Sequence, residues 1–403
     1  MAKFEVPVVR VRAVEKHPNA DRLDIVRIGD YNCISNKKED GTSRYAPGDL
    51  VVYVPEGAIV PEWLLRMGFW NEKTNMGLLA GPQGNRVKAV TLRGVISQGI
   101  MFPVSTGDVQ GFPLGDPNMN APWISVEEGQ NLATDLNIIK YEPEIPDCLK
   151  GSVASCHGWT LKGDLENVKK FPDILQEGEE VVMTEKVHGV YMQIGYVPNL
   201  EFEIDADESN GLYKDGDWFV TSKGLAEVGM VFQLNEENAE NLYVKMFRKM
   251  KERLEWLYND MYEKWQQTQD RYYPENRPFY LIGELYGPGV QDLHYSFQQE
   301  FVAHDIYMGQ PGNGWYLDED QFAYHTERAH IDRAPVLYKG PFSKGVMLQH
   351  TSGPSVLALG KHIREGLVVK PMQNRRDDRI GRVMLKSVSD EYLLRKGDAT
   401  EYA

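Results

Sequence analysis

The chain has 403 residues, of which 42% are hydrophobic and 26% are charged, a composition typical of a globular protein with roughly two or three domains. Its 44 basic and 59 acidic side chains give a net charge of −15, the wrong sign for a protein that coats nucleic acid nonspecifically. The sequence contains no apolar run of about 18 residues and no signal-peptide pattern at its start, so we expect no membrane span. The cysteines Cys33, Cys148 and Cys156 lack metal-binding spacing, which predicts reduced thiols in a cytoplasmic protein.

Residues 4–125 are predicted to be all-β. Short runs rich in Val and Ile, such as VPVVRVRAV and LVVYVP, are separated by Gly and Pro clusters at the spacing of a small barrel. Residues 126–175 mix loop-like sequence with one short helix. We interpret this second stretch as a connector between two domains.

Strands return from residue 178 onward, beginning with EEVVMTEKVHG and VYMQIGYV. The acidic stretch 201–208 alternates with Phe and Ile, and this pattern favours an exposed strand over a metal site. One long amphipathic helix is predicted over about residues 236–266. Its apolar stripe, at spacings of three or four, consists of Leu242, Met246, Met250, Leu254, Leu257, Met261 and Trp265.

Charged residues lie at or near the ends of several strands in the second half of the chain. They are Lys186, Glu284, Asp305, Lys370 and Lys386. A core strand has no reason to carry such residues, so together they indicate a polar pocket lined by a sheet. Lysines neutralise phosphate oxygens, and carboxylates hold Mg²⁺ together with substrate phosphates. The pattern therefore indicates phosphate chemistry. The region 361–396 also carries excess basic residues, which form either a solvated face or a local anion-binding groove.

The order of these residues resembles the covalent nucleotidyltransferases, which include DNA ligases, RNA ligases and mRNA capping enzymes. The matching segments are TEKVHG at 184–189, LIGELYG at 281–287, HDI at 304–306, EGLVVK at 365–370 and LK at 385–386. The TEKxHG form and the N-terminal position of the β-rich domain are most similar to the Deinococcus-type nick-sealing RNA ligases. HPNADRLDIVRIG also looks like the OB fold of tRNA-binding domains.

The resemblance implies an α+β fold with two domains. An N-terminal OB-type β-barrel would span 1–125, a connector 126–175, and a nucleotidyltransferase domain of antiparallel sheets flanked by helices 176–403. The implied activity is that of an ATP-dependent RNA ligase that seals 3′-OH/5′-phosphate nicks. Its expected partner is a nicked duplex with RNA on the 3′-OH strand, and we expect it to act as a monomer.

By this resemblance Lys186 is the nucleophile. Its amine would attack the α-phosphorus of ATP, form a lysyl-AMP bond and release pyrophosphate. The AMP would then pass to a 5′-phosphate end, and a 3′-hydroxyl would expel it and seal the strand. A free lysine has a pKa of about 10.4, so the amine must first lose its proton. Nearby cations, Lys370, Lys386 and Mg²⁺, would favour the uncharged form.

The resemblance also implies roles for the residues around Lys186. Glu365 and Glu284 would hold Mg²⁺ or Mn²⁺, and Glu284 would accept a hydrogen bond from the ribose. Lys223 would contact the 5′-phosphate, and His188 would support the Lys186 loop and contact phosphate, unless it is a packing histidine. The predicted nucleotide-binding set is Thr184, Glu185, Lys186, His188, Gly189, Lys223, Glu284, His304, Asp305, Glu365, Lys370 and Lys386.

Two departures from the family pattern leave alternatives open. An aromatic residue usually precedes the Asp of the third motif, but His304 stands there, so either His304 or Phe301 would stack on adenine. RNA ligases often carry two lysines in the last motif, whereas Met384 occupies the first of these positions. Arg382 or Arg379 could supply the missing charge.

The spacing of Glu365 and Lys370 poses a separate difficulty. An odd separation of five places the two side chains on opposite faces of a flat strand. Either Glu365 lies in the turn before the strand, or a bulge or strong twist intervenes.

Two other functions remain open from the sequence. One is an mRNA-capping guanylyltransferase on the same fold. The other is an RNA- or tRNA-binding protein with an inactive nucleotidyltransferase domain, for which the imperfect motifs are the argument. The joint presence of Lys186, Glu284, Glu365 and Lys370 favours an active enzyme.

Overall fold

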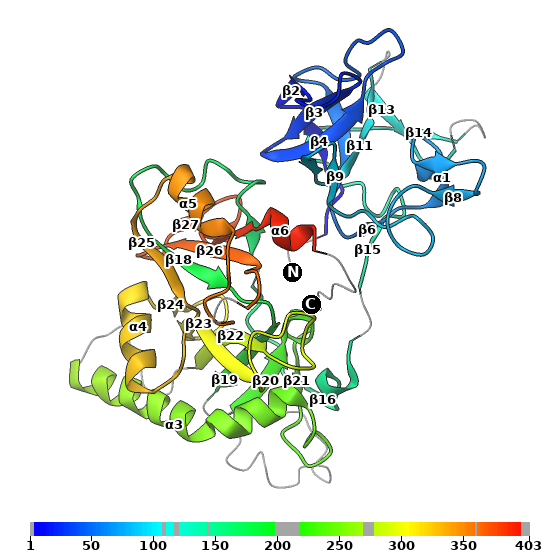
Figure 1. Ribbon diagram of the computed structural model, residues 1–403. Helices are drawn as coiled ribbons and strands as arrows, with labels where there is room; N and C mark the ends of the chain where they lie inside the picture. The colour runs from blue at the N-terminus through cyan, green and yellow to red at the C-terminus, as the bar shows by residue number, and fades with distance from the viewer. Residues whose placement is uncertain are drawn as a thin grey trace. The chain divides into compact units, whose positions relative to one another are not determined.

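The computed structural model describes residues 4–106, 110–116, 121–142, 145–163, 165–197, 218–268, 278–358 and 361–395. The chain folds into two compact units (Figure 1). The N-terminal unit comprises Ala2–Glu142 and Val168–Pro172, and the C-terminal unit comprises Pro143–Asn167 and Asp173–Ala403. Residues 126–175, predicted as a connector, therefore contribute to both units. The acidic stretch 201–208 lies outside the described residues.

The N-terminal unit consists mainly of short antiparallel strands. Three three-stranded sheets have the orders β1-β5-β11, β2-β3-β4 and β12-β13-β14. Their strands are β1 (Val8–Arg10), β2 (Ala13–Lys16), β3 (Leu23–Ile28), β4 (Tyr31–Asn36), β5 (Leu50–Val54), β11 (Ile100–Pro103), β12 (Ser105–Thr106), β13 (Gln110–Pro113) and β14 (Trp123–Ser125). The other elements of this unit are β6 (Ala58–Ile59), α1 (Glu62–Leu65), β7 (Trp70–Asn71), β8 (Met76–Gly77), β9 (Val90–Leu92), β10 (Val95–Ser97) and β15 (Ile139–Lys140).

The predicted β-barrel is not closed within the described residues. Its strands form separate sheets, and the chain changes partners between β1 and β2. The Val11 amide donates to the Asp49 carbonyl at 2.8 Å, and the Arg12 amide donates to the Arg27 carbonyl at 2.8 Å. The first bond extends the pairing of β1 with β5 and the second extends the pairing of β2 with β3, so the chain passes from one sheet to the other between Val11 and Arg12. The prediction of an all-β unit is otherwise confirmed, apart from the one-turn helix α1.

Two sheets form the C-terminal unit. The seven-stranded sheet has the order β16-β21-β20-β19-β22-β23-β24. Its strands are β16 (Val153–Ser155), β19 (Val190–Tyr196), β20 (Trp218–Ser222), β21 (Met230–Phe232), β22 (Phe279–Tyr286), β23 (Glu300–Met308) and β24 (Trp315–Tyr316). The five-stranded sheet, β17-β29-β26-β18-β25, is antiparallel except between β17 and β29. Its strands are β17 (Glu166–Asn167), β18 (Glu180–Lys186), β25 (Val336–Pro341), β26 (Gly366–Pro371) and β29 (Leu385–Val388).

The predicted long helix is confirmed as α3 (Leu242–Thr268). It begins later than about residue 236 because Asn241 caps it. The Asn241 side-chain oxygen accepts a hydrogen bond from the Val244 amide at 3.1 Å, which satisfies one of the free amides of the first turn.

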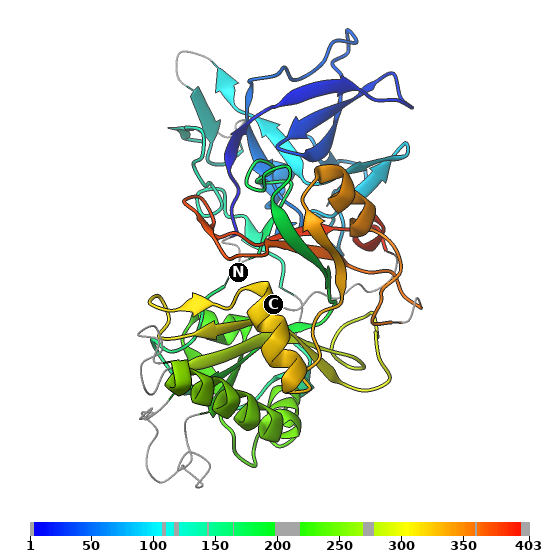
Figure 2. The same ribbon diagram turned by 90° about the vertical axis from the view of Figure 1, so that its left-hand side faces the viewer.

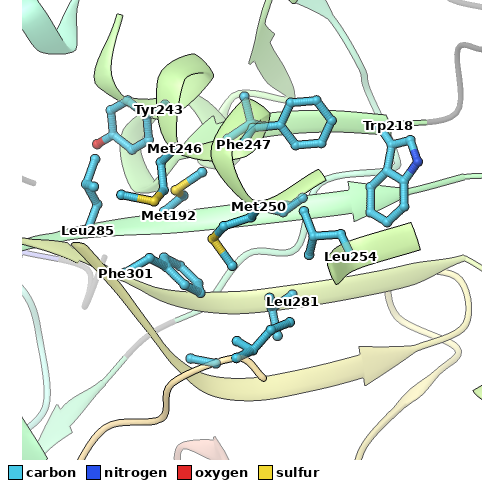
Figure 3. Close-up of a cluster of buried hydrophobic side chains, with 14 of the residues drawn as sticks. Met192, Trp218, Tyr243, Met246, Phe247, Met250, Leu254, Leu281, Leu285 and Phe301 are labelled. Atoms are coloured by element: carbon cyan, nitrogen blue, oxygen red, sulfur yellow. The ribbon is translucent and has the colours of Figure 1, made fainter. Parts of the chain in front are cut away.

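Helix α3 lies along one face of the seven-stranded sheet (Figures 1 and 2), and its apolar residues between Leu242 and Met261 are buried in the core there. Figure 3 shows Met246, Met250 and Leu254 of the helix beside Met192 and Leu281 of the strands, all of them buried. This core fixes which face of the sheet remains for chemistry, because strand residues alternate between the two faces.

The other helices of the C-terminal unit are short. They are η2 (Asp147–Leu149), α2 (Lys223–Glu227), α4 (Glu319–Arg328), α5 (Lys344–Thr351) and α6 (Asp390–Leu393), and a small hairpin is formed by β27 (Arg376–Asp377) and β28 (Gly381–Arg382). Among the described residues, no helix combines the length and the apolar character needed to cross a membrane. The unit is thus mostly sheet with few helices, in agreement with the predicted class.

Candidate active site

Two of the predicted lysines share one face of the five-stranded sheet. Lys370 on β26 lies directly opposite Val182 on β18. Lys186 ends the same strand four residues later. Because opposed residues share a face and side chains alternate along a strand, Lys186 and Lys370 point to the same side.

Thr184 and Lys386 lie on this same face, whereas Glu185 does not. Thr184 pairs with Val368, which in turn pairs with Lys386 on β29. Glu185 alternates to the opposite face, where it is 1% exposed and accepts a hydrogen bond from the Val356 amide at 2.7 Å. Burial raises the pKa of this carboxyl. The structure therefore does not bring the Glu185 side chain to the lysines.

Glu365 comes immediately before β26, so the first explanation of its spacing from Lys370 is confirmed. Its carboxylate forms an ion pair with the Lys186 ammonium. Burial would raise the pKa of Glu365, but Lys186 and His188 lower it to about 2. The next residue must be glycine, because a Cβ at Gly366 would lie 2.1 Å from the Ser387 carbonyl oxygen.

A β-bulge in β23 determines which residues face away from α3. Asp305 pairs with Ile282, but Ala303 pairs with Gly283, so His304 is an extra residue. Phe301 is 6% exposed and lies in the core under α3 (Figure 3). His304 lies on the other face, with its ring 6.4 Å from that of Tyr191. Of the two candidates for stacking on adenine, only His304 is on the side of the lysines.

Glu284 is positioned on β22 beside the Lys186–Glu365 pair. Burial raises the pKa of Glu284 to about 7, while the Lys186 charge opposes this rise and Glu365 adds to it. Lys223, the first residue of α2, also acts to lower the pKa of Glu284. Gly189 allows this approach, because a Cβ there would lie 2.4 Å from the Leu285 carbonyl oxygen.

The donor set around Glu284 and Glu365 fits a metal ion that is bound together with a nucleotide. Within the described ranges, no group of three or more His, Cys, Asp or Glu side chains could hold a metal alone. Mg²⁺ is commonly bound by one or two carboxylates and keeps its remaining positions for water and substrate phosphates. Two carboxylates close enough to influence each other's titration meet that requirement.

A buried ion cluster joins the two sheets behind His304. Asp305 accepts two hydrogen bonds of 2.7 Å from Arg382, and the Lys370 ammonium lies 3.2 Å from Asp305 and 3.3 Å from Glu319. Burial would raise the pKa of Asp305, but Arg382 and Lys370 hold it well below its usual value. Arg382 is thus paired with a carboxylate. Arg379, the other predicted substitute for the missing lysine, pairs with Asp173 and Asp377.

His188 is held by protein groups at both ring nitrogens. Nε2 lies 2.8 Å from Asp292 Oδ1, and Nδ1 lies 2.8 Å from the Tyr392 hydroxyl. A carboxylate only accepts, so Nε2 carries the proton, and in the neutral ring Nδ1 accepts from Tyr392. Arg395 in turn pairs with Asp292 at 3.0 Å. These contacts suit a residue that supports the Lys186 loop rather than one that contacts phosphate.

The sequence analysis missed Asp292, Tyr392 and Arg395. Tyr392 and Arg395 follow the last family segment by several residues, and Asp292 lies in a loop without a motif. The only sequence signal for Tyr392 and Arg395 was Ser389, a residue type that often precedes a helix. It indicated the short helix α6 but gave no function for the residues that follow. Only the folded chain brings the C-terminal segment onto His188.

Replacement of Tyr392 by phenylalanine is expected to slow formation of a nucleotide adduct about tenfold, because the buried Nδ1 of His188 loses its nearer partner and keeps only Glu365, 3.6 Å away. The effect should vary with pH, since the hydroxyl interacts differently with neutral and protonated imidazole. Rates measured across pH 6–9, with Tyr324→Phe at an exposed tyrosine as the control, test this. Equal rates for both variants would contradict the supporting role.

A pH effect is expected from Glu284 in metal-free and nucleotide-free buffer. Because folding raises the pKa of Glu284 from 4.5 to about 7, its carboxyl opposes folding increasingly as the pH rises between these values. The stability of Glu284→Gln relative to the wild type should therefore increase from pH 5 to pH 8, as measured by urea unfolding. Glu240→Gln, at an exposed carboxylate, is the control. If the difference in unfolding free energy between Glu284→Gln and the wild type were the same at pH 5 and pH 8, the Glu284 carboxyl would not titrate in this range.

Comparison with known proteins places the chain in a family. The model of the RNA ligase family matches residues 179–388, just over half of the chain, and a model described as an OB-fold domain matches residues 6–104. The chain belongs to the RNA ligase family. It is therefore an RNA ligase with an N-terminal OB-fold domain. No curated protein matches the sequence.

Solved structures of Naegleria gruberi RNA ligase are similar over nearly the whole chain. The form with PPi is 20% identical, with 98% of each chain covered and a TM-score of 0.68. Substituted forms with AMP and Mn and with ATP and Mn give 20% and 19% identity and TM-scores of 0.67 and 0.65, with 96% of this chain and 97% of theirs covered. At this level of identity the likeness shows the shared fold.

Proposed function

We propose that this RNA ligase uses ATP and seals 3′-OH/5′-phosphate nicks through a lysyl-AMP intermediate on Lys186. The observation that carries the proposal is the contact of the Lys186 ammonium with Glu365, on the sheet face that also holds Lys370 and Lys386. The relatives solved with ATP, AMP and Mn support the choice of nucleotide and metal.

In the first step the Lys186 amine attacks the α-phosphorus of ATP, an Nζ–P bond forms and the bond to pyrophosphate breaks. Only an uncharged amine can attack, and a neighbouring carboxylate stabilises the ammonium. Separation of Glu365 from Lys186 is therefore part of activation. Lys386 is half-buried on the same face, and in this proposal its ammonium neutralises phosphate oxygens.

Mg²⁺ or Mn²⁺, held by Glu365 and Glu284, would neutralise triphosphate charge. In this proposal three other predicted residues bind the substrates. His304 stacks on the base, and Glu284 accepts a hydrogen bond from a ribose hydroxyl. Lys223 binds the 5′-phosphate of the nick once AMP has been transferred. The 3′-hydroxyl then attacks that phosphorus and AMP leaves.

We also propose that the N-terminal unit holds the nicked duplex, with RNA on the 3′-OH strand, and that the protein works as a monomer. The OB-fold match supports this division of labour. Among the aromatic residues of this unit, Tyr45 and Tyr53 are buried in the core, so we do not assign base stacking to them. Trp123 is instead an exposed ring in this unit.

The decisive experiment incubates the protein with labelled ATP or GTP and divalent metal, and then with nicked duplexes. We expect an acid-labile adduct with ATP and sealing of a nick that has RNA at its 3′-OH end. An adduct with GTP alone would indicate a capping enzyme. The absence of any adduct would indicate a nucleic-acid-binding protein with an inactive domain.

A further inference from the structure

The C-terminal unit contains a cavity of about 900 Å³ that the proposed chemistry does not use. Its wall is formed by residues 157–162, residues 227–229, the turn between β23 and β24, and the hairpin of β27 and β28. None of the predicted nucleotide-binding residues lines it. The cavity wall therefore contains none of the residues assigned to the lysyl-AMP chemistry.

Positive charge dominates the wall. Lys162, Arg375, Arg376 and Arg382 line the cavity, against the single carboxylate of Glu227. Arg375 pairs with Glu179, and Arg382 pairs with Asp305. Lys162 and Arg376 are exposed and make no ion pair with a described residue. In a chain of net charge −15, two uncompensated cations at one cavity indicate an anionic ligand.

Aromatic rings lie beside these cations. Tyr307 and Tyr316 contact edge to face with ring centres 4.9 Å apart. Trp315, the neighbour of Tyr316 on β24, packs instead against the core under α3. The Arg382 guanidinium lies 3.7 Å from the centre of the Tyr316 ring. Aromatic rings stack on nucleobases. Lysine and arginine side chains nearby bind the phosphates that link one nucleotide to the next. The wall thus combines an aromatic ring for a base with cations for a phosphate, the two components of a nucleotide-binding surface.

Arg382 connects this cavity with the candidate active site. It lines the cavity and bonds Asp305, which follows His304 and contacts Lys370. A ligand in the cavity therefore lies behind the buried ion cluster and close to the nucleotide-binding residues without occupying their place.

We propose that this cavity is a second nucleotide-binding site, which holds one nucleotide of the substrate strand. Lys162 and Arg376 bind its phosphate, and Tyr316 contacts its base. The assignment of the ligand to a strand rests on the proposed ligase function, since a free nucleotide has the same chemistry.

The test compares the double variant Lys162→Ala/Arg376→Ala with the wild type. Binding of a nicked duplex is measured by fluorescence anisotropy without ATP, at several salt concentrations. We expect affinity to fall about tenfold and the salt dependence to weaken by roughly one to two ions, because two phosphate contacts are lost. Adduct formation with ATP should be unchanged.

Two control variants isolate the role of the cavity. Lys162→Arg/Arg376→Lys keeps both charges and should bind as the wild type does. Lys245→Ala/Lys249→Ala removes two cations of the same unit that are already paired with carboxylates, and should have little effect. If Lys162→Arg/Arg376→Lys lost as much duplex affinity as the alanine variant, the positive charge of these residues would not explain their role.

Two outcomes would overturn the proposal. Unchanged duplex binding in the alanine variant would show that the cavity does not hold the strand. A higher KM for ATP with unchanged duplex binding would show that the ligand is the free nucleotide. Duplex binding is measured without ATP, so its result does not depend on whether the protein forms an adduct. Failure of the wild type to form an adduct would count against the proposed function and not against the cavity.

Discussion

Replacement of Lys186 by alanine is expected to abolish the covalent nucleotide adduct, with a loss of at least about 10³-fold in rate, because no other group forms the Nζ–P bond. Mass spectrometry of the protein after incubation with ATP and divalent metal should place the AMP at position 186 in the wild type and nowhere in the variant. An adduct of normal yield in the variant would refute the assignment of the nucleophile.

The variant Lys186→Arg keeps the positive charge at this position but removes the amine that would attack ATP. The guanidinium keeps the ion pair with Glu365 but stays protonated, so it cannot act as the nucleophile. We expect this variant to fold as the wild type does and to form no adduct. Lys339→Ala, on the neighbouring strand β25, removes an exposed lysine that pairs with Asp320 and should leave the adduct unchanged. Loss of the adduct in that control would point to a general effect on the sheet.

The second large effect is expected at Asp305. Its replacement by alanine should lower the free energy of unfolding of the C-terminal unit by about 3–5 kcal/mol, because Arg382 and Lys370 would remain buried without this carboxylate. Asp320→Ala breaks a surface pair and should cost only about 0–1 kcal/mol. Urea unfolding followed by tryptophan fluorescence measures both. Equal losses would contradict the view that the cluster links the two sheets.

The effect of Asp305 should also depend on pH. The pKa of the Asp305 carboxyl is much lower in the folded chain than in the unfolded chain. The carboxylate therefore stabilises the fold fully at any pH above its unfolded-state pKa, and this stabilisation is lost as the pH falls through the folded-state pKa. The unfolding curves of the wild type and of Asp305→Ala should therefore converge at acid pH. Parallel curves down to the acid limit would indicate that the loss comes from packing rather than from charge.

Several parts of this structure follow from local patterns in the sequence. The period of α3 and the alternation of β18, β26 and β29 depend only on neighbouring residues, and Asn241 supplies the cap that sets the start of the helix. The shared face of Lys186, Lys370 and Lys386 follows from alternation once the strands are paired. The same rule separates Glu185 from Lys186, although the two are adjacent in the chain and were predicted together.

Other features depend on contacts between distant segments. The bulge at His304 arises from the pairing of β23 with β22, and it decides that His304 and not Phe301 faces the lysines. The Tyr392 hydroxyl reaches His188 across 204 positions of sequence, and Arg382 reaches Asp305 across 77. No local pattern encodes such pairs.

The amino-acid sequence by itself determined the membership of this chain in the RNA ligase family, the strand positions of its lysines and its long helix, because periodicity and motif spacing are properties of neighbouring residues. Tertiary structure alone decided how the sheets of the N-terminal unit join, which groups hold His188, and where the cationic cavity forms. Those features arise when segments far apart in the chain pack together, and their energies come from burial and from charge pairs that exist only after folding.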